Sequence, residues 1–154
     1  MFAVSLLGAY VFMYLLASKF WGKLGGFISG VFYSFAPYHA VDLYVRGALG
    51  ELWGLMLFPA IFWSLVKLEQ KTNNSNLTLC VIFIASLITS HNLSAMLFLP
   101  LTFIWILILF LKRRIKKFIG YSLASVFLGI LISAFYLFPM LLEKNLVHVE
   151  TTTY

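Results

Sequence analysis

Long apolar runs fill most of the chain, and short hydrophilic breaks separate them. A helix rises about 1.5 Å per residue, so roughly 20 apolar residues cross a bilayer core of about 30 Å. The pattern predicts six transmembrane helices, at residues 2–17, 24–41, 52–68, 77–90, 93–111 and 118–142. The run 77–90 is short for a span, so the turn after it, at His91, is expected to be recessed below the outer membrane surface. Ser90 or Asn92 is the expected N-cap of the next helix.

The composition agrees with a membrane protein. Apolar residues make up 62% of the 154 residues and aromatic residues 18%, whereas soluble domains contain roughly 45–50% apolar residues. A soluble globule of this size has too little interior to bury so much apolar surface. We therefore expect an all-α polytopic membrane protein, with residues 1–154 forming a single membrane domain. The one cysteine, Cys80, lies inside an apolar run and is expected to be a packing residue.

The charges separate between alternate breaks. Breaks 18–23, 69–76 and 112–117, counted with Lys67, carry nine basic residues and one acid, a net charge of +8. The loop 42–51 and the C-terminal residues from Glu143 onward carry a net charge of −2. By the positive-inside rule, the first three breaks are cytoplasmic loops, and the loop 42–51 and both termini are extracytoplasmic. The overall charge of +6 thus reflects topology in a cell membrane and indicates no nucleic-acid partner.

Basic and small residues suggest contacts within the membrane. The cluster Lys112–Lys117 could also hold anionic lipid head groups. Small residues recur every fourth position in two of the runs, which places them on one helix face and lets another helix approach closely. We expect these faces to be packing surfaces: Ser18, Gly22, Gly26, Gly30 and Ser34 in one run, and Ser125, Gly129 and Ser133 in the other.

The stretch from Tyr38 to Trp53 holds the chain's most concentrated polar chemistry. Within it, His39, Asp42, Arg46 and Glu51 lie between two apolar runs. If residues 39–46 form a short interfacial helix, His39, Asp42 and Arg46 share a face, and Asp42 and Arg46 can form an ion pair. Each residue also has a structural role open to it: a local ion pair, a first-turn acid at Glu51, or a polar tip at the interface for His39.

Taken together, these residues predict a site for a phosphate group. An arginine fork beside two carboxylates, flanked by Gly47 and Gly50, suits a phosphate or a metal-bound phosphate. Arg46 and His39 are therefore candidate phosphate ligands, and a recessed His91 is a third. Asp42 and Glu51 are candidate catalytic carboxylates and candidate ligands of a divalent metal ion.

Three stretches resemble a family of polytopic membrane proteins labelled pyruvoyl-tetrahydropterin-synthase-related. They are Tyr38–Glu51, Thr89–Ala95 and Ala134–Lys144, and the resemblance covers nearly the whole chain. That family is similar to the polyprenyl-phosphate-dependent C-type glycosyltransferases, whose acidic residues lie on outer loops. The resemblance implies transfer of a sugar from a polyprenyl-phosphate donor at the extracytoplasmic face.

The same resemblance implies that the chain is a fragment of a larger membrane domain. The usual catalytic carboxylate of those enzymes lies in a first outer loop, and this chain is predicted to begin after it. Asp42, Arg46, Glu51 and His91 would then form a second wall of the cleft, with membrane lipids and the rest of a longer polypeptide as partners. Two alternatives stay open: a transporter or lipid-handling protein, and a non-catalytic membrane assembly module.

Overall fold

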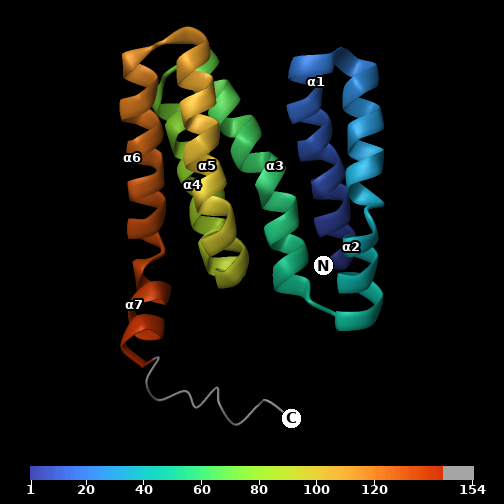
Figure 1. Cartoon of the computed structure of the whole chain (residues 1–154). Helices are drawn as coiled ribbons and strands as arrows, with labels where there is room; N and C mark the ends of the chain where they lie inside the picture. The colour runs from blue at the N-terminus through green and yellow to red at the C-terminus, as the bar shows by residue number, and fades with distance from the viewer. Residues whose placement is uncertain (144–154) are drawn as a thin grey trace.

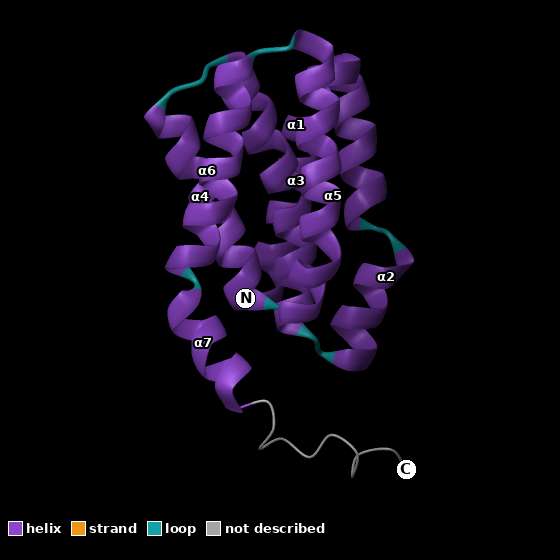
Figure 2. Cartoon of the chain, turned by 60° about the vertical axis from the view of Figure 1, so that its left-hand side comes forward, coloured by secondary structure: helices purple, strands orange, loops and turns teal. Residues whose placement is uncertain are grey.

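The computed structural model describes residues 1–143, and every regular element within that range is helical (Figures 1 and 2). The elements are, in order, α1 (Phe2–Ser34), α2 (Pro37–Ala40), the π-helix η1 (Val41–Arg46), α3 (Leu49–Gln70), α4 (Asn74–Ser90), α5 (Asn92–Arg113), α6 (Lys116–Ile132) and α7 (Ala134–Glu143).

Several of these helices have the length and apolarity of membrane spans. Taken over its whole length, α1 is long and apolar enough to cross a membrane, as are α3 and α5, and α6 with α7 would be a fourth span, bent by 59°. The all-α prediction is therefore confirmed, whereas six separate spans remain a prediction. The predicted run 24–41 ends at Ser34, and the predicted run 118–142 is divided at Ser133.

Helix α1 is a hairpin. Gly22 has non-helical backbone angles (φ 70°, ψ −176°), and the two legs on either side of it run back along each other (Figure 1). A Cβ atom on Gly26 would lie 2.9 Å from the Tyr14 carbonyl oxygen, and one on Gly30 would lie 2.9 Å from the Tyr10 ring. Residues of the first predicted small-residue stripe thus have two roles. Gly26 and Gly30 permit close contact between the two legs, and Gly22 forms the turn.

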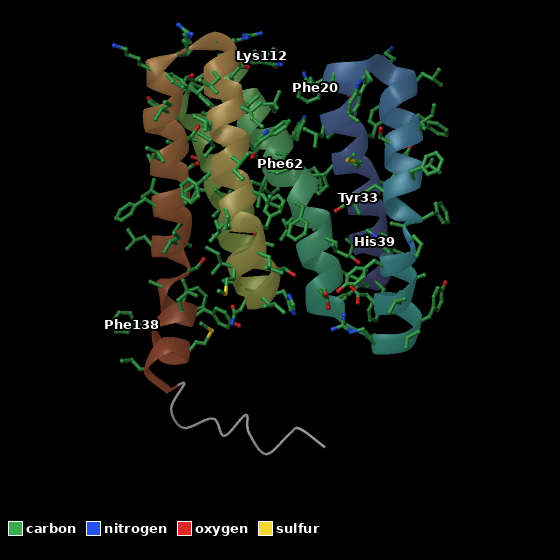
Figure 3. All side chains as sticks on the ribbon, in the orientation of Figure 1. Phe20, Tyr33, His39, Phe62, Lys112 and Phe138 are labelled. Carbon is green, nitrogen blue, oxygen red and sulfur yellow. The ribbon has the colours of Figure 1, made fainter. Side chains whose placement is uncertain are left out.

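Helix α3 lies at the centre of the bundle, packed against α1, α4 and α5. Its fully buried side chains include Leu52, Ile61, Leu65 and Leu68. Aromatic rings bind it to α5. Phe58 stacks on Phe98 at 4.1 Å between ring centroids, and Phe62 stacks on Trp105 at 4.9 Å (Figure 3 shows the position of Phe62). Stacked rings add specific geometry to the burial of large apolar surfaces.

Helices α4 and α6 meet through the second predicted stripe. Ser125, Gly129 and Ser133 are all buried, and a Cβ on Gly129 would lie 2.7 Å from the Ile84 side chain. The Ser133 hydroxyl donates to a carbonyl oxygen of its own helix, that of Gly129 at 2.9 Å, and lies 3.3 Å from the carbonyl oxygen of Ala85 in α4. The predicted packing role of this stripe agrees with these contacts. The chain bends at Ser133, between the end of α6 and the start of α7.

The two ends of the bundle differ in chemistry. At one end, Lys112 lies 5.8 Å from the centre of the Phe20 ring, and Arg113 Nε lies 2.8 Å from Glu69 Oε1 (Figure 3 labels Phe20 and Lys112). These contacts join the three basic breaks. At the other end, Gly50 packs against the carbonyl oxygen of Ser90, which joins the loop 42–51 to the His91 turn. The predicted alternation of breaks thus corresponds to two opposite ends of one bundle.

Candidate functional site

The polar stretch after α1 folds as a compact elbow. Ala36 is extended (φ −57°, ψ 137°), as the residue before a proline prefers, and α2 then starts at Pro37. The helix widens into the π-helix η1, and Gly47, in the left-handed conformation (φ 61°), caps its C-terminal end. π-helical segments are rare and are frequent at functional sites. The interfacial helix predicted for residues 39–46 is present, but its second part has this wider geometry.

Four side chains form one network at this elbow, named here the Arg46 cluster: Tyr38, Asp42, Arg46 and Glu51. Arg46 Nη1 lies 3.0 Å from Asp42 Oδ1, 2.8 Å from Glu51 Oε2 and 3.2 Å from the Tyr38 hydroxyl oxygen. The Tyr38 hydroxyl in turn donates a hydrogen bond to Glu51 Oε1. The Asp42–Arg46 ion pair predicted from the sequence spacing is therefore present.

Burial within the cluster is graded. Asp42 is fully buried, the Glu51 side chain is 12% exposed, and the Arg46 side chain is 50% exposed. In the described part of the chain, every polar contact of Arg46 ends on Nη1. Nε and Nη2 can therefore donate to a ligand, because a guanidinium carries five N–H groups. The cluster thus holds a half-exposed arginine by one of its nitrogens.

The electrostatics follow from this burial. Desolvation raises the pKa of the Asp42 carboxyl, the Glu51 charge adds to that effect, and Arg46 opposes it. The hydrogen bond to Glu51 raises the pKa of Tyr38, so this hydroxyl stays protonated and remains a donor to the carboxylate. The Tyr38 hydrogen bond and the Glu51 charge raise the pKa of Arg46, which keeps its positive charge.

His39 lies outside the cluster. Its side chain is only 4% exposed, and its ring packs edge-on against Tyr33 at 5.2 Å between centroids (Figure 3). Neither ring nitrogen has a hydrogen-bond partner in the described residues, and His39 lines a small cavity of about 120 Å³ with Ser34 and Tyr44. Burial lowers the pKa of His39, while the Asp42 charge acts in the opposite direction.

His91 joins the site from the other side. It is the N-cap of α5, because its Nδ1 accepts from the Ser94 backbone N–H at 3.2 Å and lies 2.7 Å from the Ser94 hydroxyl. The prediction of Ser90 or Asn92 as this cap was wrong. A Cβ on Gly50 would lie 2.7 Å from the Ser90 carbonyl oxygen and 3.8 Å from the His91 ring. A larger residue than glycine at position 50 would force the turn and the first turn of α3 apart.

Asp42 and Glu51 are also the candidate ligands of a divalent metal ion. Within residues 1–143, no group of three His, Cys, Asp or Glu side chains is placed to hold a metal ion. Asp42 and Glu51 both contact Arg46, so the guanidinium is the cation between them in this arrangement. As they stand, the two carboxylates do not form a cradle for a divalent ion, and metal binding remains a prediction.

An apolar groove opens beside the cluster, with a volume of about 210 Å³. Tyr38 and Glu51 line its polar end, and the remaining lining comes from α3 and α5: Leu55, Phe58, Ser94, Leu97, Phe98 and Leu101. Tyr38 was not among the site residues predicted from the sequence. A signal was present, since Tyr38 precedes Asp42 by four positions, as Asp42 precedes Arg46.

Comparison with known proteins places the chain in a family. An uncharacterized protein of Lactococcus lactis subsp. cremoris (strain MG1363) is 26% identical over 138 residues, which cover 86% of this chain but 22% of that protein. The chain thus spans about a fifth of the length of this relative. No solved structure matches. The model of the 6-pyruvoyl-tetrahydropterin synthase related domain, described as a membrane protein, matches residues 1–154. The chain therefore belongs to this family of multi-pass membrane proteins.

Proposed function

We propose that the chain is the membrane module of a glycosyltransferase-like protein that acts on a polyprenyl-phosphate-linked sugar at the extracytoplasmic face. The observation that carries the proposal is the Arg46 cluster, in which an arginine held by two carboxylates presents an open edge beside an apolar groove. A lipid phosphate needs both features in one place: a fork of donors for its head group and an apolar surface for its chain.

Each cluster residue has a distinct task in this proposal. Arg46 donates from Nε and Nη2 to the phosphate oxygens, which stabilises the negative charge that develops on the leaving phosphate. Glu51 accepts the proton of the acceptor hydroxyl as that oxygen attacks the sugar. The bond between the sugar and the phosphate oxygen breaks, and the phosphate leaves with the electron pair. Asp42 and Tyr38 position Arg46 and Glu51.

The other candidates have supporting roles. His91, beside Gly50, would contact the phosphate or accept a proton from the opposite side of the elbow. His39 would act through the shape of the elbow, since its ring is buried. A divalent metal between phosphate and carboxylates is the alternative to a direct contact with Arg46. The full activity would also use parts of a longer polypeptide, and the carboxylate of the first outer loop that the resemblance implies is the alternative to Glu51 as the base.

The proposed topology has six spans with both termini extracytoplasmic. It is supported by the segregation of charge, because the basic breaks lie at the end of the bundle opposite the Arg46 cluster. In this orientation the cluster faces the outside of the cell membrane, where a lipid-linked sugar and its acceptor would meet.

A lipid-handling protein is a second candidate. The combination of one anion-binding edge and an apolar groove would also suit a protein that binds a lipid phosphate without transferring a sugar. Sugar transfer separates the two functions, because a lipid-handling protein would bind the same donor and leave it intact.

The test is transfer of a radiolabelled sugar from a prenyl-phosphate donor by the full-length protein in vesicles, with and without Glu51→Gln. Removing a general base typically costs roughly a hundredfold or more in rate. Glu69→Gln is the matched control, because Glu69 is also paired with an arginine but lies at the other end of the bundle. At equal abundance, we expect activity to fall in Glu51→Gln alone. Full activity in Glu51→Gln would contradict the assignment of Glu51 as the base.

A further inference from the structure

The end of the bundle opposite the Arg46 cluster carries an excess of positive charge. The three breaks that meet there hold nine basic residues, counted with Lys67, and one acid, Glu69. The Glu69 side chain is only 5% exposed, and its Oε1 lies 2.8 Å from Arg113 Nε. Because Arg113 neutralises that acid, the breaks hold no acid for the other basic residues. The Arg46 cluster has the opposite balance, since two carboxylates there face one guanidinium.

The turn between α5 and α6 has an uncommon backbone conformation. Arg114 has φ 54° and ψ 32°, and within residues 1–143 every other residue with a positive φ is a glycine. A residue with a side chain is strained in this left-handed region, and glycine is the usual residue where a helix ends in it. Ile115 packs against the core, whereas Arg114 is exposed. The turn therefore presents a positive charge at a position where the backbone favours glycine.

The basic side chains lie at the boundary between polar and apolar surface. Three of their ammonium groups stand over aromatic rings: Lys67 at 4.7 Å from the centre of Trp63, Lys112 at 5.8 Å from Phe20, and Lys117 at 5.4 Å from Tyr121 (Figure 3 labels Lys112 and Phe20). Beside them, Trp21 is 69% exposed and Leu111 is 60% exposed. A partner that fits this surface needs an anionic group directly beside hydrocarbon. A phospholipid has both, whereas a nucleic acid offers no hydrocarbon chain to the apolar side.

We propose that this end of the bundle binds the phosphate head groups of anionic phospholipids. The surface, named here the basic-turn surface, consists of exposed basic residues in the turn of α1 and around the α5–α6 turn: Lys19, Lys23, Lys112, Arg114, Lys116 and Lys117. Contact between Lys112 and Phe20 joins the two turns. The lipid phosphate accepts from the guanidinium of Arg114 and from the ammonium groups, and the acyl chains lie against the apolar side. Such binding requires no sugar transfer, and it is possible in either orientation of the bundle.

The test measures retention of radiolabelled phosphatidylglycerol by the purified full-length protein in a non-ionic detergent at physiological ionic strength. Unlabelled phosphatidylglycerol should displace the label. Phosphatidylcholine with the same acyl chains should not, because its choline group cancels the charge of its phosphate. Inorganic phosphate and a short DNA oligonucleotide, each at the same phosphate concentration, should not displace it either, because neither has an acyl chain.

Substitutions at position 114 separate binding from folding. Arg114→Gly should weaken binding of phosphatidylglycerol about fivefold, which is roughly what one basic residue near anionic lipid contributes. In lipid-free detergent the same variant should melt at the wild-type temperature or above it, because glycine removes the left-handed strain. Arg114→Lys keeps the charge and should keep the affinity. The matched control is Lys71→Gln, which removes one exposed charge from the α3–α4 turn, outside the basic-turn surface, and should change the affinity less than about twofold.

Each other outcome would overturn the inference. Equal displacement by phosphatidylcholine would mean that any bilayer phospholipid binds, and equal displacement by inorganic phosphate would mean that the lipid is not required. Equal displacement by the oligonucleotide would favour a nucleic-acid partner. Equal losses of affinity in Arg114→Gly and Lys71→Gln would show attraction by net charge without a defined surface. Wild-type affinity in Arg114→Gly, or a lower melting temperature, would show that Arg114 serves the fold.

Discussion

At the scale of single residues, the site depends on how much water each polar group has lost. Asp42 is fully buried and its Oδ2 has no partner in the described residues, while Arg46 keeps half of its surface. A buried carboxylate with one bonded oxygen is costly unless a cation is held against it. Asp42 therefore fixes the position of Arg46, and Arg46 offers the remainder of its fork outward.

His39 makes stability depend on pH. Its folded-state pKa is lowered by burial, so below the ordinary histidine value of about 6.5 the unfolded chain binds a proton that the folded chain rejects. We expect the melting temperature of the purified protein to fall as the pH is lowered from 7.5 through about 6. His39→Phe keeps the ring against Tyr33 and should lose this dependence.

The control for this prediction is His91→Gln, which leaves His39 in place and should retain the fall at low pH. Nearby Asp42 favours the protonated ring and therefore limits the size of the effect. The same pH dependence in wild type and His39→Phe would show that another group is responsible.

For single residues, the sequence predicts which side chains belong to the site better than it predicts their positions. The i to i+4 spacing correctly predicts the Asp42–Arg46 pair. The same spacing argument puts His39 on the face of Asp42, but its ring packs inward on Tyr33. Burial of a ring depends on the shape of the neighbouring hairpin, and this shape is not contained in a local spacing pattern.

At the scale of elements, glycines with close neighbours behave differently from glycines in open space. A Cβ on Gly26 would lie 2.9 Å from a backbone oxygen of the facing leg, whereas one on Gly120 in α6 would have nothing within 4 Å. We expect Gly26→Ala to lower the free energy of unfolding by about 1–3 kcal/mol, because the backbones of the hairpin must separate. Gly120→Ala should be neutral or stabilising by up to about 1 kcal/mol.

Unfolding of each variant in mixed detergent micelles measures the difference. Because both glycines lie in helices and receive the same methyl group, helix propensity favours alanine equally at the two positions. Equal stability of Gly26→Ala and Gly120→Ala would contradict the packed hairpin.

The limits of hydropathy are visible in two elements. The bend between α6 and α7 lies at Ser133, inside a predicted apolar run. The Ser133 hydroxyl donates to a carbonyl oxygen of its own helix, so a serine can lie within an apolar run and does not mark a hydrophilic break. The end of α1 before Pro37 had a local signal, since the residue before a proline avoids helix. The apolar run continues across it, and a prediction from hydropathy alone passes over that signal.

At the scale of the whole molecule, charge segregation predicts orientation. A cysteine introduced at Leu49 lies at the end of the bundle with the Arg46 cluster, and one at Asn74 lies beyond α3, towards the basic end. In a cysteine-free background that includes Cys80→Ala, a membrane-impermeant maleimide added to intact cells should label position 49 and spare position 74. Labelling of position 74 together with protection of position 49 would show that the protein has the opposite orientation.

The gathering of the three basic breaks at one end of the bundle is predicted well from the sequence, and the orientation of that end across a membrane remains a prediction. Lys112 near Phe20 and Arg113 beside Glu69 bring the three basic breaks together, as their alternation predicts. The groove beside the Arg46 cluster could not be predicted, because it depends on which faces of α3 and α5 meet. Hydrophobic runs this uniform do not specify those faces.

The most direct measurement for the central claim is sugar transfer by the full-length protein carrying Arg46→Lys. Lysine keeps the positive charge but lacks the planar fork, so it cannot hold Asp42 and Glu51 through one nitrogen and still offer two further donors to a phosphate. We expect the rate at equal membrane abundance to fall roughly a hundredfold, nearly as far as in Arg46→Ala. Arg113→Lys, in the ion pair at the opposite end, should retain the rate. Full transfer by Arg46→Lys, together with full transfer by the double variant Asp42→Asn with Arg46→Gln, would contradict the account and leave the cluster as scaffolding.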